Sequence, residues 1–100
     1  MKTKEITDFR SKHTVLTEPL TKEELKELVG KRKSFKVLIS LDELIKTNPT
    51  GFYVDMQKKI AGRRLNMLLD PTFEIAGRNA STNEAIIKVT AEIFDIYTED

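Results

Sequence analysis

The sequence predicts an α+β fold: a small antiparallel sheet of about four strands, packed on one face by two or three short helices. Three observations lead to this prediction. Helix capping signals and helically spaced apolar residues recur between residues 21 and 61, whereas alternation of apolar and polar residues dominates from residue 65 onward. The chain has 100 residues, 39% apolar and 33% charged, which suits one soluble globular domain with a single core.

The first twenty residues are the least patterned part of the chain. Their apolar residues follow no clear period, and Pro19 ends the stretch. We therefore expect a poorly patterned N-terminal arm over 1–20, containing one short strand at 14–16. A single globular domain is expected over 21–100.

The first helix is predicted at 22–29. Thr21 and Glu24 stand three residues apart and form a capping-box pattern, in which each side chain accepts a hydrogen bond from the other residue's backbone N–H. Apolar residues follow at helical spacing, and Gly30 supplies a C-terminal stop.

Two further helices are predicted at 41–46 and 51–61. Ser40 and Glu43 repeat the capping-box pattern before the first of them. The second has one apolar residue every four positions, at Phe52, Met56 and Ile60. An alternative for this segment is a strand, because its first residues also alternate between apolar and polar.

The strands are predicted at 35–40, 65–69 and 72–78, where β-branched, aromatic and alternating apolar residues occur. The intervening Asp-Pro-Thr favours a turn, so the last two segments are either two strands or one bent strand.

The segment 84–97 is a fork between strand and helix. A capping-box pattern, Ser81 with Glu84, precedes apolar residues at helical spacing, yet the same residues alternate and many of them are β-branched. We predict a long strand paired with 72–78. The predicted core consists of the inward-facing apolar residues of all these elements: Leu25, Leu28, Val37, Ile39, Leu44, Phe52, Met56, Ile60, Leu69, Phe73, Ile75, Val89, Ala91 and Ile93.

Catalytic groups are scarce, so we expect a protein that is not an enzyme and that holds no cofactor or metal. Cysteine is absent, which excludes disulfides, thiolate catalysis and cysteine-ligated metals. His13 is the one histidine, and it has no companion at metal-ligand spacing. The isolated glycines form no phosphate-binding loop.

The chain shows no targeting or membrane segment. Its first residues lack the apolar stretch of a signal peptide, and no run approaches the roughly 18 apolar residues of a membrane span. We therefore expect a cytoplasmic protein that does not contact a membrane.

Charge and apolar residues in the C-terminal segment lead to the functional prediction. Residues 84–100 carry five acids and one base, and apolar and aromatic residues stand among the acids. Apolar anchors within a charged rim are typical of protein interfaces, and a long strand at a sheet edge pairs readily with another chain. We therefore expect a small protein-binding module of accessory, regulatory or inhibitor type, binding another protein or itself as a homodimer. The candidate interface residues are Glu92, Phe94, Ile96 and Tyr97.

The alternative is a nucleic-acid-binding protein. Its candidate contacts fall in two basic clusters, 31–36 and 58–64: Lys31, Arg32, Lys33, Lys36, Lys58, Lys59, Arg63 and Arg64. If both clusters share one face, they would contact phosphates, and Phe35, Phe52 or Tyr53 would stack on unpaired bases. The simpler interpretation is that the second cluster complements the carbonyl end of the 51–61 helix.

Overall fold

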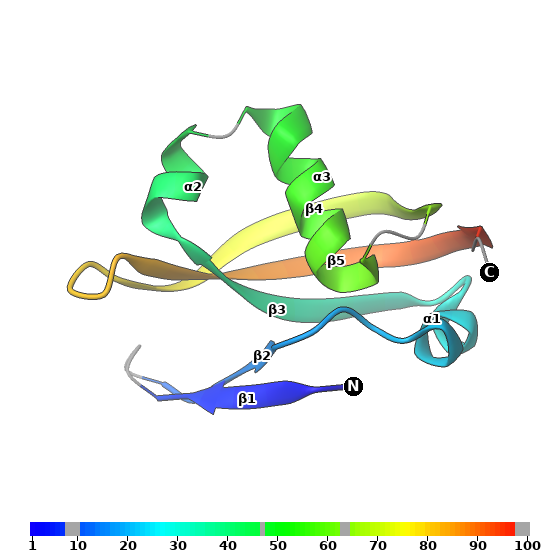
Figure 1. Cartoon of the computed structure of the whole chain (residues 1–100), viewed down its shortest axis with the longest axis horizontal. Helices are drawn as coiled ribbons and strands as arrows, with labels where there is room; N and C mark the ends of the chain where they lie inside the picture. Colours follow the sequence, from blue (N-terminus) through cyan, green and yellow to red (C-terminus); the bar gives the residue numbers. More distant parts are fainter. Residues whose placement is uncertain (8–10, 47, 63–64, 98–100) are drawn as a thin grey trace.

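The computed structural model describes residues 1–7, 11–46, 48–62 and 65–97, with the side chains of 46, 65–67 and 94–97 excepted. It contains one five-stranded sheet with the strand order β1-β2-β3-β5-β4 (Figure 1). The strands are β1 Thr3–Ile6, β2 His13–Leu16, β3 Arg32–Ser40, β4 Leu65–Asn79 and β5 Glu84–Tyr97. The helices are α1 Lys22–Leu28, α2 Leu41–Lys46 and α3 Pro49–Ala61. The predicted α+β fold is therefore confirmed.

The sheet differs from the prediction in strand number and direction. It has five strands, and the β2–β3 pair is parallel, whereas β1–β2, β3–β5 and β4–β5 are antiparallel. The physical reason is the connection between β2 and β3, which passes through α1. A connection of this length lets the chain re-enter the sheet in the same direction, which a tight hairpin does not.

The N-terminal segment expected to be an arm supplies β1 and β2, and three of its apolar side chains are buried. Val15, Leu16 and Leu20 are at most 9% exposed, and the backbone N–H of Leu20 donates to the carbonyl of Ile60 at 2.8 Å. The sequence signal was weak because two four-residue strands are too short to display a period.

The helix ends follow the capping signals. Glu24 N–H donates to Thr21 Oγ1 at 3.2 Å, and Thr21 N–H donates to Glu24 Oε1 at 3.0 Å, so the predicted capping box is confirmed. A hydrogen bond from the N-terminal amine, followed by that from the Thr21 backbone, lowers the pKa of Glu24 to about 2.

Helix α3 begins two residues earlier than predicted. Asn48 Oδ1 accepts a hydrogen bond from Gly51 N–H at 2.7 Å, and Pro49 takes the first helical position. Proline suits this position because its φ is already helical and its missing N–H would have had no partner there.

Strands β4 and β5 settle the two remaining alternatives. The segment 65–79 is one bent strand rather than two, with its register against β5 shifting at three places. The segment 84–97 is a strand, as predicted. Its β-branched residues suit the pleated surface.

One face of the sheet carries the main core, and we call it the covered face. It bears Phe35, Val37 and Ile39 of β3 and packs against side chains from all three helices. Figure 1 shows α2 and α3 lying over this side of the sheet. Their contributions, together with Leu25 of α1, build the single core that the composition predicts.

Two residues of the predicted core are in fact exposed. Leu69 is 36% exposed because the register of β4 shifts by one residue between Asn66 and Leu68, so that Leu68 takes the buried place opposite Ile93. Ile75 is 50% exposed although it pairs with a buried residue of β5, because β4 is the last strand of the sheet.

The opposite face, which we call the open face, carries the alternate residues Ser34, Lys36 and Leu38 of β3. A small apolar cluster on this face contains no helix residue among the described part of the chain. Its members are Val15, Ile86, Ile6, Leu38 and Ala76.

Candidate functional site

The prediction that the C-terminal strand lies at a sheet edge is wrong. Strand β5 lies between β3 and β4. The connection from β3 through α2 and α3 to β4 leaves room for one strand between them, and β5 returns from β4 into that space.

The last four residues of β5 are nevertheless paired on one side only. Arg32 with Glu92 is the last pair between β3 and β5, and the loop before β3 then bonds to Ile93. Gly30 N–H donates to the Ile93 carbonyl at 2.8 Å, and Ile93 N–H donates to the Lys31 carbonyl at 3.4 Å. Beyond this point β5 pairs with β4 up to Tyr97, and no other strand of the described residues lies against it.

The backbone geometry identifies which groups face this unpaired side. Successive residues of a strand direct their N–H and C=O groups to opposite neighbours. The register against β4 shifts between the pairs Leu68–Ile93 and Asn66–Ile96, where β5 has one extra residue, so the alternation is interrupted there. Ile93 bonds toward the β3 side and Ile96 occupies the equivalent place opposite β4, so Ile96 is the next residue whose backbone groups point that way. The end of β5 therefore offers the main-chain N–H and C=O groups of Ile96 on this side.

The predicted interface residues fall at this end of the molecule. The Glu92 side chain is half-buried, between Arg32 on β3 and Leu69 on β4. The side chains of Phe94, Ile96 and Tyr97 lie outside the described residues.

Two exposed apolar side chains flank the end of β5. Val29 is 43% exposed and forms a β-bridge with Ile93, and Leu69 is 36% exposed. Neither was recognised from the sequence, because Val29 had been placed inside a helix and Leu69 inside the core.

The sheet separates the predicted basic clusters. Strand alternation places Arg32 and Lys36 on the open face and Lys33 on the covered side, while Lys31 precedes β3.

The second cluster lies on another part of the fold. Lys58 and Lys59 occupy the last turn of α3, and Arg63 and Arg64 lie outside the described residues. A cavity of about 360 Å³ is lined by Lys58 and Lys59 with residues of β3 and of the segment after β2, and by no cation of 31–36.

The three aromatic residues suggested for base stacking are engaged in the core. Phe35 is 6% exposed. Phe52 meets Phe73 edge-to-face, with ring centroids 5.0 Å apart. Tyr53 packs against the core and donates its hydroxyl to the Leu68 carbonyl at 2.9 Å. Base stacking by these side chains would require them to leave these contacts.

His13, which has no companion at metal-ligand spacing in the sequence, is buried. It is 6% exposed, its Nε2 lies 2.9 Å from Ser11 Oγ, and its Nδ1 lies 3.2 Å from Lys36 Nζ. Because an ammonium only donates, Nδ1 accepts from Lys36 and Nε2 is left to donate to Ser11. No sequence pattern links His13 to Lys36, since 23 residues separate them.

A second cavity, of about 330 Å³, is lined by Lys12, Lys36 and Lys88. Only Lys36 of these three was among the predicted basic residues. Aligning the two strands by their polar faces could have placed Lys88 opposite Lys36, but not Lys12 beside them.

Among the described residues, no group of three or more histidine or acidic side chains is arranged to hold a metal ion. In the same part of the chain, no helix has the length and apolar character required to cross a bilayer. Comparison of the chain with protein-family models, with curated proteins and with solved structures found no match. The functional argument therefore rests on the chain's own residues.

Proposed function

We propose that this protein is a small non-catalytic protein-binding module, which pairs the end of β5 with an extended segment of a partner. The partner is another protein or a second copy of the chain. The observation that carries the proposal is that β5 continues to Tyr97, whereas its pairing with β3 ends at Glu92.

In strand addition, the backbone hydrogen bonds between the partner segment and β5 would supply the affinity. An extended segment laid beside 94–97 would bond to the outward N–H and C=O groups of Ile96, and its side chains would supply specificity. The exposed side chains of Val29 and Leu69 lie near this end and provide apolar contact area.

Charge indicates the composition of the partner segment. Residues 84–100 carry five acids and one base, and Glu92 at the start of this end is half-buried. A partner segment with basic and apolar residues would complement it, since opposite potentials favour encounter and fix register.

The experiment compares two proline variants at two sheet edges. Ile96→Pro removes an N–H that points away from β4, and proline is tolerated where no ladder hydrogen bond is lost. Glu5→Pro is the matched control on β1. Its N–H also points outward, because Lys2 bonds to Thr17 and the direction alternates along the strand.

Each variant and the wild type would be used for affinity capture from a native cell lysate and for light scattering at rising protein concentration. We expect a partner, or self-association, that persists in Glu5→Pro and disappears in Ile96→Pro, with unchanged far-UV circular dichroism. Identical partners in all three proteins, or none in any together with a strict monomer, would contradict the proposal.

The nucleic-acid alternative is tested in parallel by fluorescence anisotropy at low salt with single- and double-stranded oligonucleotides. Binding that Arg63→Ala with Arg64→Ala abolishes, without unfolding, would favour that alternative over strand addition.

A further inference from the structure

The cavity beside Lys36 results from the way β2 leaves β3. The two strands pair only through Leu16 and Val37. Upstream of that pair β2 lies against β1, while β3 begins five residues earlier, at Arg32. The cavity of about 330 Å³ opens beside this divergence and lies within the size range of small-molecule sites.

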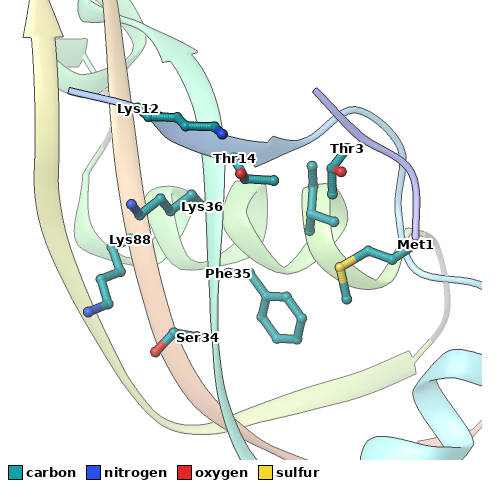
Figure 2. Close-up of a pocket in the computed structure, with 9 residues that line it drawn as sticks. Met1, Thr3, Lys12, Thr14, Ser34, Phe35, Lys36 and Lys88 are labelled. Carbon is teal, nitrogen blue, oxygen red and sulfur yellow. The ribbon is translucent and has the colours of Figure 1, made fainter. Parts of the chain in front are cut away.

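Three lysines from separate segments line this cavity: Lys12 before β2, Lys36 on β3 and Lys88 on β5 (Figure 2). No acidic side chain is among its described lining residues. Lys12 forms an ion pair with Glu5 at 3.1 Å, and both side chains are more than half exposed, so this pair is weak.

The other two lysines have no acidic partner within ion-pair distance among the described residues. Lys36 donates to the neutral acceptor Nδ1 of His13. Lys88 stands opposite Glu74 of β4 in the register, but no ion pair joins them. Two of the three lysines that line the cavity thus have no neutralising carboxylate among the described residues.

The register makes this arrangement unfavourable in the free protein. Lys36 and Lys88 are direct cross-strand partners on the same face of the sheet, and like charges in this position destabilise a sheet. An anion in the cavity would turn this repulsion into attraction to a shared ligand.

The rest of the cavity wall is apolar or carries hydroxyl groups. Met1, Leu16 and Phe35 supply apolar surface, and the hydroxyl residues are Thr3, Thr14 and Ser34. Figure 2 shows Phe35 and Met1 on the side of the cavity away from Lys88. A ligand that fits both halves has an anionic group and a short apolar part.

We propose that this cavity binds a small organic phosphate. Three ammonium groups suit a group with more than one negative charge, and lysine binds phosphate as a compact point charge. The hydroxyls can donate to phosphate oxygens, and Phe35 and Met1 can contact the organic part. The site is separate from the end of β5, so it does not depend on the proposed function.

The experiment follows backbone amide resonances by NMR during titration with n-butyl phosphate, inorganic phosphate and n-butanol. The solution is kept near pH 7, where a phosphate monoester carries about 1.5 to 2 negative charges. Butyl phosphate is expected to shift the amides of Thr14, Ser34 and Lys36, and inorganic phosphate to do so more weakly. Butanol, at the same concentrations, is expected to leave them unchanged.

Two variants and one control locate the binding groups. Lys88→Gln and Lys36→Gln are each expected to weaken butyl phosphate binding about tenfold, the low end for the loss of one charge-assisted hydrogen bond. Lys58→Gln removes the same charge from α3, outside this cavity, and is expected to leave the affinity unchanged.

Three results would overturn the proposal. These are an absence of shifts at millimolar butyl phosphate, an equal loss of affinity in Lys58→Gln, and equal affinities for inorganic and butyl phosphate. An equal loss in Lys58→Gln would indicate general electrostatic attraction rather than a site. Equal affinities for the two phosphates would show that the cavity does not recognise an organic group.

Discussion

The two faces of the sheet share one hydrogen-bonded backbone, yet, among the described residues, the side chains of the covered face pack against helices and those of the open face do not. Val89 points to the covered face and is fully buried beneath the helices, whereas its neighbour Thr90 is half-buried on the open face and bonds to Ser34 Oγ at 2.8 Å. On the covered face, packing against the helices restricts a position to apolar residues. On the open face the same strands are free to carry charge, and the lysine-lined cavity lies there.

The largest expected effect tests this contrast at adjacent residues. Val89→Asp would place an unpaired charge among apolar side chains, and we expect a loss of several kcal/mol or failure to fold. Thr90→Asp introduces the same charge one residue away and should cost about 1 kcal/mol or less, mainly the hydrogen bond to Ser34. Urea unfolding followed by circular dichroism measures both. Similar losses would show that the open face is not solvated.

A smaller difference in stability is expected between alanine substitutions at two buried isoleucines that belong to different apolar clusters. Ile87 lies in the main core and Ile86 in the small open-face cluster, and both are at most 1% exposed. Ile87→Ala should cost about 3 to 5 kcal/mol. Ile86→Ala should stay near 2 kcal/mol, because two of its cluster neighbours, Ile6 and Val15, lie on four-residue strands that can relax into the space. Equal losses in chemical unfolding would mean that the open-face cluster packs as rigidly as the main core.

The smallest expected change in stability comes from replacing a lysine by glutamine, and its sign differs between Lys88 and Lys58. Lys88→Gln removes the repulsion from Lys36 and should raise stability by about 0.2 to 1 kcal/mol. Lys58→Gln removes a cation from the last turn of α3 and should lower stability by about 0.3 to 1 kcal/mol. Thermal unfolding at low and high salt checks both, since screening should shrink each effect. A loss of stability in Lys88→Gln would indicate that Glu74 pairs with Lys88 in solution.

Local signals explain which parts of the fold were predictable. The capping box of Thr21 and Glu24 and the turn before α3 act within a few residues, and the alternation in 84–97 reflects a strand with a buried face. Such patterns identify elements without reference to their neighbours. The boundaries of α1 and α2 therefore agree with the prediction to within one residue.

The candidate sites depend on pairing between strands that are distant in the sequence. Whether 94–97 has a free side follows from where β3 ends relative to β5, and Lys36 meets Lys88 through a pairing that joins residues 52 positions apart. The exposure of Leu69 depends on a one-residue register shift in β4. None of these relations leaves a periodic trace in the sequence.

From residue 21 onward, the sequence by itself determined most of the secondary structure, the α+β class and most of the side chains that the helices cover, because capping, periodicity and burial act on neighbouring residues. Only the tertiary structure decided the order of the strands, the parallel entry of β2 and the separation of the basic residues between two faces. The physical reason is that strand pairing uses backbone groups that every residue possesses, so the choice of partner depends on chain connections and on how whole faces pack. The free end of β5 and the lysine-lined cavity both arise from that choice.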